Sequence, residues 1–304
     1  MFTLQTPSHL RSVRGGLALS CVLLAMTLAA QAQTQAACTF NVFSTATTLT
    51  YLGTPQFLDP RGINDFGTIV GNATPRKPRG LIRWANGGVV KVKGTRLLTA
   101  RNDHGTSLGL DKSDRPILVN GPNTSPTITP IVFGANITGV GEALNGINQR
   151  GTIVGQGVVN NSVYHGFKRW NTGTTHLLDF PGASFTTPLG INDNGTVVGA
   201  YDGADGLTHG FIFNNGQWAT LDYPQASYTA VVGITNAGKI IGNAFVNSTD
   251  TLFLYENGTF EVISVPNLVS GSAPRLISIS PKLGLILGAT DFHFDQPAFI
   301  AQCQ

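Results

Sequence analysis

Charged side chains are scarce in this sequence. Lys, Arg, Asp and Glu make up 12% of its 304 residues, about half of the usual quarter in globular proteins. Basic and acidic side chains are nearly balanced, at 19 and 16. A nucleic acid or an anionic membrane is therefore not an expected partner, because binding either one needs a concentrated basic surface.

Long apolar runs are also lacking. The most apolar stretch, residues 17–30, falls short of the roughly 20 residues that span a bilayer. Arg11 and Arg14 precede it, and the small-x-small site Ala30-Gln31-Ala32 follows it. Because this order is typical of an export signal, we expect residues 1–32 to be a signal peptide. The mature chain is then expected to carry no transmembrane segment and to be secreted, into the periplasm or the medium.

One phrase recurs along the chain. Its clearest copy reads Gly-Ile-Asn-Asp-Phe-Gly-Thr-Ile-Val-Gly, and two of the copies are degenerate. The copies cover residues 62–71, 101–109, 146–155, 190–199, 233–242 and 278–288. Repeats of this length are typical of solenoids and propellers, and the spacing indicates six units of roughly 43 residues each.

Each unit predicts four short strands. The Asn-Asp-x-Gly part is typical of a hairpin turn whose last Gly takes a positive φ. The turn residues include Asn64, Gly67, Asn148, Gly151, Asn192, Gly195 and Gly238. The β-branched run that follows is typical of a buried strand. A second hairpin is marked by an aromatic residue three places before a glycine, as in Trp84 before Gly87.

Four strands in a unit of this length favour an all-β propeller of six four-stranded blades, formed by residues 33–304 as one domain. A parallel β-helix is the runner-up fold, although its rungs are usually shorter than these units. The turn polar residues Asn64, Asp65, Asn192 and Asp193 are candidate ligands as well. Because the same types recur in almost every unit, we interpret them as structural turn residues.

The sixth unit ends before its fourth strand. Cys303 follows Gly284 by 19 residues, the place where the other units turn into their last strand. Residues 39–52 are strand-like and precede the first unit, so they can supply the missing strand. Cys38 and Cys303 are the only cysteines beyond the expected signal, and an even count in an exported protein favours pairing. We therefore predict a Cys38–Cys303 disulfide and closure of the ring by the N-terminal strand.

The units carry a second motif in register with the first. His165-Gly166-Phe167 and His209-Gly210-Phe211 follow their copies of the phrase. The pair of motifs resembles the bacterial extracellular HAF repeats, named for a His-Ala-Phe triplet, over residues 62–300. Gly replaces Ala here, and the units with Arg79-Gly80-Leu81, Pro116-Ile117-Leu118 and Leu252-Phe253-Leu254 lack the His. The resemblance implies an exported repeat protein and brings no catalytic residues.

A few other residues suggest site chemistry. Asp291, His293 and Asp295 alternate, so a strand would project all three from one face, where they could hold a divalent cation. A surface hairpin explains them equally simply. His165 and His209 share one repeat position, where we expect a hydrogen bond between blades rather than a metal contact. Residues 202–206 are acidic and glycine-rich but lack the spaced ligands of a calcium loop, so we interpret them as a surface turn.

Two functions remain open. The first is a binding or scaffold module for an extracellular protein or carbohydrate, acting through inter-blade loops such as residues 120–142. The second is an extracellular polysaccharide-acting hydrolase or lyase, which needs facing carboxylates. Asp111, Asp114 and Glu142 are scattered candidates without a signature. We expect no cofactor and a monomer. Two or more acids converging at the mouth of a central channel would favour the enzyme, and a channel lined by repeat turns would favour the binding module.

Overall fold

The repeated phrase forms a tight turn between two antiparallel strands in every unit of the computed structural model. The turn of the phrase ends on a glycine in each copy, and its φ ranges from +66° at Gly284 to +93° at Gly238. A side chain in this left-handed region is strained, which accounts for the recurrence of glycine there. The expected turn chemistry is therefore present in all six units.

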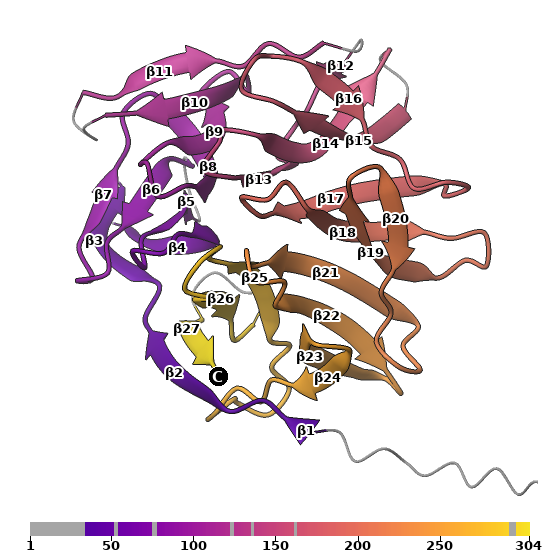
Figure 1. Cartoon of the computed structure of the whole chain (residues 1–304). Coiled ribbons are helices and arrows are strands. Elements are labelled where there is room, and N and C mark those ends of the chain that lie inside the picture. The colour runs from indigo at the N-terminus through magenta and orange to yellow at the C-terminus, as the bar shows by residue number, and fades with distance from the viewer. Residues whose placement is uncertain are drawn as a thin grey trace, which may run out of the picture. The chain divides into compact units, whose positions relative to one another are not determined.

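The structure describes residues 34–51, 54–74, 78–121, 125–134, 137–160, 163–291 and 296–304. They belong to one compact unit, Gln33–Gln304, and the expected signal segment lies outside them. The fold is an all-β propeller (Figure 1). No helix among these residues has the length and apolar character needed to cross a bilayer.

The strands within the described residues form six blades. Blade 1 contains β3 (Ala46–Tyr51), β4 (Thr54–Ile63), β5 (Ile69–Thr74), β6 (Gly80–Arg83) and β7 (Val89–Lys91). Blade 2 contains β8 (Thr95–Arg101), β9 (Ser107–Asp111), β10 (Pro116–Asn120) and β11 (Thr127–Pro130). Blade 3 contains β12 (Ile137–Gly139), β13 (Leu144–Ile147), β14 (Ile153–Val159), β15 (Val163–Arg169) and β16 (Thr175–Leu177).

The remaining blades follow the same order. Blade 4 contains β17 (Phe185–Ile191), β18 (Val197–Asp202), β19 (Thr208–Asn214) and β20 (Gln217–Thr220). Blade 5 contains β21 (Tyr228–Ile234), β22 (Ile240–Val246), β23 (Thr249–Glu256) and β24 (Thr259–Val262). Blade 6 contains β25 (Arg275–Ile279), β26 (Ile286–Ala289), β27 (Ala298–Cys303) and the N-terminal β2 (Cys38–Phe43). Neighbouring strands within a blade are antiparallel, and one parallel bridge, Thr208 to Tyr228, joins blades 4 and 5.

The strand that leads into each repeat turn lies innermost, and the last strand of each blade lies toward the rim (Figure 1). The innermost strands are β4, β8, β13, β17, β21 and β25. The core is divided into clusters of buried side chains between neighbouring blades. Between blades 2 and 3, for example, Leu108 of β9 packs with Ile147 and Ile153. The repeat therefore places β-branched residues where two sheets meet face to face.

The last glycine of the phrase makes room for two neighbours. A Cβ at Gly242 would lie 2.6 Å from the carbonyl oxygen of Ala230 and 2.2 Å from the ring of Phe253. Phe253 occupies the third place of the second motif, and the equivalent Phe167, Phe211 and Phe299 are also fully buried. The strand register shows that the second motif is Thr251-Leu252-Phe253 in blade 5 and Arg115-Pro116-Ile117 in blade 2. The triplets assigned from the sequence in these two units were therefore one residue too late.

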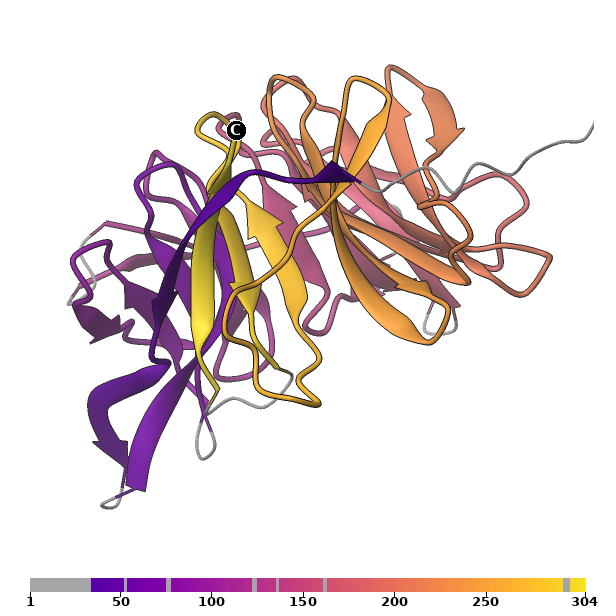
Figure 2. The same cartoon turned by 90° about the horizontal axis from the view of Figure 1, so that it is seen from below.

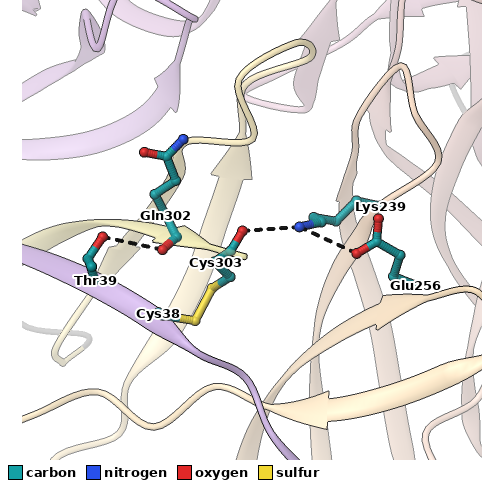
Figure 3. The surroundings of a disulfide bond; sticks show 6 residues. All are labelled: Cys38, Thr39, Lys239, Glu256, Gln302 and Cys303. Carbon is teal, nitrogen blue, oxygen red and sulfur yellow. Dashed lines mark hydrogen bonds and ion pairs between the residues drawn. A yellow bond between two sulfur atoms is a disulfide. The ribbon is translucent and has the colours of Figure 1, made fainter.

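The N-terminal strand closes the ring, as predicted. β2 pairs antiparallel with β27, and Cys38 lies directly opposite Cys303, with their Cα atoms 4.0 Å apart and their sulfurs bonded (Figure 3). The short strand β1 (Thr34–Gln35) pairs in parallel with β24 of blade 5, and Figure 2 shows this segment passing from blade 5 to blade 6. The N-terminal segment therefore contacts two adjacent blades.

Two expectations about loops and strands were wrong. Of the strand-like residues 39–52, only residues 39–43 join blade 6, as part of β2, because Ala46–Tyr51 turns back and pairs with β4. Residues 120–142, expected to form an inter-blade loop, are partly blade structure. Its described part contains β11, which pairs with β10, and β12, which pairs with β14. Its polar, proline-containing sequence is compatible with an outer strand, where one edge needs no ladder partner.

We expect the Cys38–Cys303 bond to contribute strongly to stability. It closes a loop of 265 residues, for which the chain-entropy model gives about 5 kcal/mol as an upper value. The double variant Cys38→Ser/Cys303→Ser should therefore unfold at a lower temperature than the wild type, and reductant should destabilise only the wild type. Alkylation of the native protein without reductant, followed by intact-mass measurement, is the direct check. Two alkylated cysteines would contradict the bond.

Candidate functional site

Each turn asparagine uses both ends of its side chain. In blade 4, the Asn192 Oδ1 accepts a hydrogen bond from the backbone N–H of Thr196 at 3.0 Å. The Asn192 Nδ2 donates to the carbonyl oxygen of Thr235 in blade 5 at 2.9 Å. Asn64, Asn102 and Asn148 donate in the same way to the next blade, at 3.3, 3.1 and 3.0 Å. These buried amides therefore close their own hairpins and also join neighbouring blades.

The residue after each asparagine forms a second circle of hydrogen bonds. Each backbone N–H donates to the side chain of the following blade, in the pairs Asp65 to Asp103, Asp103 to Gln149, Gln149 to Asp193 and Asp193 to Asn236, at 2.8–3.1 Å. Asn236 N–H donates to the Pro281 carbonyl at 2.7 Å. Lys282 and Leu283 N–H donate to Asp65 Oδ1 at 3.0 and 2.8 Å, which completes the circle among the described residues.

The acids at this mouth of the channel are held by that circle. Desolvation raises the pKa of Asp65, but the Leu283 N–H and further hydrogen bonds outweigh it and leave the pKa below its usual value. The pKa of Asp103 is raised by desolvation and by Asp65. The Lys282 ammonium lies 3.6 Å from an Asp103 oxygen. We interpret these carboxyl groups as structural acceptors, consistent with the turn role expected for Asp65 and Asp193.

The centre of the ring holds only a small cavity. Its volume is about 50 Å³, which is room for a few water molecules and not for a sugar ring. The backbone and side chains of the inner strands line it, including Gly146, Ile147 and Ile191, and its described lining contains no acid. The cavity therefore does not meet the condition set for the hydrolase, which was a pocket at the channel mouth lined by two or more convergent acids.

The scattered acids also do not form a free pair. Asp114 and Glu142 both form ion pairs with Arg96, and Glu142 lies 2.7 Å from that guanidinium. Asp111 accepts backbone hydrogen bonds from Ser113 and Arg115 and forms an ion pair with the Arg115 side chain. Their charges are thus used to hold surface turns and a strand.

One pentapeptide, Gly105-Thr106-Ser107-Leu108-Gly109, has the spacing of a nucleophile elbow. Such an elbow exposes its serine on a sharp turn between a strand and a helix. Ser107 instead begins strand β9, is fully buried, and accepts a hydrogen bond from Arg101 Nη1 at 2.7 Å. Its environment is therefore not that of an exposed nucleophile.

The repeat histidines bond to their own blade's exit segment, so the expectation of a bond between blades was wrong. His165 Nδ1 lies 2.8 Å from Asp179, and His209 Nδ1 lies 2.7 Å from Asp222. The pairing of the chain explains this. Each carboxylate also accepts the N–H of the glycine after the histidine, which places it beside the histidine ring of its own blade. His209 Nε2 is additionally 3.1 Å from Asp205, in the acidic segment interpreted as a surface turn.

The pKa of His209 reflects these carboxylates. Desolvation lowers it, and the hydrogen bonds and charges of Asp222 and Asp205 outweigh that effect, so that the pKa of His209 is raised. Asp205 has a lowered pKa because it accepts the Leu207 N–H and a bond from His209. Both ring nitrogens of His209 thus face carboxylate oxygens, which fits an imidazolium better than a metal ligand.

The predicted metal trio is only partly described. Asp291 lies at the end of the described stretch before residue 292, and His293 and Asp295 lie outside the described residues. Within the described part of the chain, no group of three or more His, Cys, Asp or Glu side chains has the arrangement of a metal site. The cation site therefore stays a prediction.

A cleft opens between blades 1 and 2, on the face that carries the repeat turns. It has a volume of about 470 Å³, within the range of small-ligand sites. Phe66, Trp84, Arg101 and Asp103 line it, together with Asn86. Phe66 is 67% exposed, and the Arg101 guanidinium lies 5.8 Å from the centre of the Trp84 ring.

A second cleft, of about 240 Å³, lies between blades 4 and 5 at the opposite ends of the strands. Phe185 and Tyr228 contribute partly exposed rings to it, and Asp202 contributes a carboxylate that accepts a bond from Thr208. Sequence reasoning missed both clefts. The first had a detectable signal, because Arg101 stands where most copies of the phrase have isoleucine.

Comparison with known proteins agrees with the fold. No family model matches the sequence, and no curated protein matches it. Among solved structures, putative TolB from Agrobacterium tumefaciens superposes with a TM-score of 0.55 at 11% identity, over 88% of this chain and 98% of that one. TolB from Acinetobacter baumannii gives 0.52 at 13% identity, over 79% of this chain and 66% of that one. At these identities the likeness shows the fold alone.

We expect Asn192→Ala to destabilise the ring by roughly 2 to 4 kcal/mol, because it leaves the Thr196 N–H buried without a partner and removes the amide bond to the Thr235 carbonyl, which keeps only the Gly238 N–H. Asn194→Ala is the matched control. Asn194 lies in the same turn and donates to the carbonyl of Asn236 at 3.0 Å, but it is exposed, so its loss should cost less than about 1 kcal/mol. Chemical denaturation of both variants measures the difference. Equal losses would contradict the proposed importance of the buried hydrogen bonds made by Asn192.

Proposed function

We propose that this protein is a binding module that acts outside the cytoplasm and not an enzyme. The observation that carries the proposal is the use of the channel-mouth acids as acceptors for backbone N–H groups, around a cavity too small for a substrate. A glycosidase needs two carboxyl groups free to face a bond in the substrate. The protein offers clefts on its faces instead, on a rigid ring of sheets, which is the usual arrangement of a recognition surface.

The cleft between blades 1 and 2 is the proposed ligand site. Its volume of about 470 Å³ suits a small ligand or one or two sugar units. Exposed Phe66 and half-buried Trp84 provide flat apolar surfaces, and Arg101 and Asn86 provide hydrogen-bond donors. This mixture of aromatic and polar groups supports a carbohydrate or the surface of a protein as partner. The resemblance to HAF repeats is compatible with this role and stays a proposal.

Export is part of the same proposal. The Cys38–Cys303 bond supports it, since disulfides persist mainly in oxidising compartments. We expect the N-terminal sequence of protein recovered from the periplasm or the medium to begin at Gln33, because cleavage is expected after Ala32. Replacing Ala30 and Ala32 by bulky residues should leave the precursor uncut, while the same change at Gln31 should be tolerated. Exported protein that still begins at Met1 would contradict the signal.

Binding without turnover is the expected behaviour of the purified protein. Affinity electrophoresis in gels containing polygalacturonate, xanthan or dextran should show retardation in at least one gel, and a reducing-end assay should show no cleavage or new unsaturated ends. Phe66→Ala should weaken retardation, because it removes an exposed ring from the cleft. Tyr164→Ala is the matched control, since Tyr164 is 53% exposed and lies at the opposite ends of the strands. Release of new chain ends would replace this proposal by the hydrolase or lyase.

A further inference from the structure

Blade 2 breaks the repeat at two facing positions. In the other five blades, an aliphatic residue before the turn pairs across the hairpin with another aliphatic residue after it. The pairs are Ile63–Ile69, Ile147–Ile153, Ile191–Val197, Ile234–Ile240 and Ile279–Ile286. In blade 2, the same pair is Arg101–Ser107. A cation and a hydroxyl thus replace two aliphatic side chains together.

The aliphatic pairs have a structural role in the other blades. Each pair packs against the preceding blade, as Ile63 and Ile69 pack with Leu287 of blade 6. The cluster between blades 1 and 2 contains Leu98, Ile117 and Val119 from blade 2, and it includes neither Arg101 nor Ser107. The apolar cluster between these two blades therefore does not extend to the substituted pair, and a cleft opens beside that pair.

The substituted pair is ordered by hydrogen bonding but lacks a counter-charge. Arg101 Nη1 donates to the fully buried Ser107 Oγ at 2.7 Å, which fixes one edge of the guanidinium. No ion pair to Arg101 is found among the described residues, and burial lowers the pKa of Arg101 with no opposing contribution. A half-buried charge without a partner costs stability. Such a departure from a stabilising repeat is expected at a functional site.

A neighbouring carboxyl group lines the same cleft. Asp103 Oδ1 accepts the Asp65 N–H at 3.0 Å, and its other oxygen lies 3.6 Å from the Lys282 ammonium. These contacts offset the charge of Asp103 within the channel-mouth circle. Arg101 has no such contact and sits beside the ring of Trp84. The uncompensated charge of the cleft is therefore positive, and a flat aromatic surface adjoins it.

We propose that the cleft between blades 1 and 2 binds an acidic saccharide, with a sugar carboxylate on the Arg101 guanidinium and the sugar ring against Phe66 and Trp84. The inference rests on the proposed binding function and adds the chemical class of the ligand. A guanidinium matches the two oxygens of a carboxylate with paired N–H donors. The adjoining rings provide apolar faces for the C–H side of a pyranose, while hydroxyl groups reach the Asn86 amide and solvent.

The test uses the full exported protein and defined oligosaccharides. Titration calorimetry should show binding of tetragalacturonate, and the neutral galactose oligomer of the same length should bind roughly 10- to 100-fold more weakly, as expected for loss of a charge-assisted hydrogen bond. Affinity for the acidic oligomer should fall as salt rises, since the site is open to solvent. Sulfated galactose oligomers serve as a third arm that separates a carboxylate preference from a general preference for anions.

Arg101→Ile is the decisive variant because it restores the residue found in the other five blades. It should abolish the preference for the acidic oligomer while leaving the unfolding temperature unchanged or higher, since an aliphatic contact replaces an unpaired charge. Arg101→Lys should keep part of the preference, because it retains the charge without the paired donors. Arg169→Ile is a control, since that arginine lies near Phe133 at another blade interface.

Each outcome decides the proposal. Binding of tetragalacturonate with loss of preference in Arg101→Ile would support it. Equal affinity for acidic and neutral oligomers, a preference for the sulfated arm, unchanged affinity in Arg101→Ile, or no measurable binding to any arm would overturn the ligand class. A large fall in unfolding temperature in Arg101→Ile would assign Arg101 a structural role instead. Cleavage of the oligomers would overturn the binding function itself, and mass spectrometry of the titrated sample detects it separately.

Discussion

The hydrogen bond from a turn asparagine to the next blade is the constraint on which the ring depends. One short side chain closes its own hairpin and reaches the neighbouring blade, so local turn geometry and ring assembly are specified by the same residue. Because the amide is buried, both ends must be satisfied at once. A blade that rotated or slipped by one residue would leave several of these groups unpaired.

Blades 5 and 6 lack this asparagine, and other contacts hold these two blades. Thr235 and Ser280 replace the asparagine in blades 5 and 6, where their hydroxyls still accept a turn N–H but no amide reaches onward. The backbone bond from Asn236 to Pro281 joins blade 5 to blade 6. The β1 segment and the disulfide lie at the same two blades. Lys239 adds a bond to the Cys303 carbonyl at 3.0 Å (Figure 3).

The same ring explains where function is to be sought. The carboxyl groups at the channel mouth accept backbone hydrogen bonds, as Asp65, Asp103 and Asp193 do. They are therefore occupied and are not available to act on a substrate. The faces between blades are less constrained, because a blade interface keeps its contact even if one end of it opens. The interface between blades 1 and 2 differs from the others in this way. Arg101 and Ser107 replace an aliphatic pair there, and a cleft lies beside them. A repeat fold can thus acquire a site by substitution in one unit.

Sequence alone determined the features that are local or periodic. The turns at Gly67 and Gly195, the four strands of most units, the propeller and the Cys38–Cys303 pairing follow from short motifs, their spacing and the count of cysteines. Only the tertiary structure decided what lies across a blade interface, because those partners are some 43 residues apart and depend on register and twist. The hydrogen bond from Asn192 to Thr235 and the setting of Arg101 beside Trp84 are of this kind. The partner of His165 and the pairing of β11 lie within one blade, but they too depend on strand register.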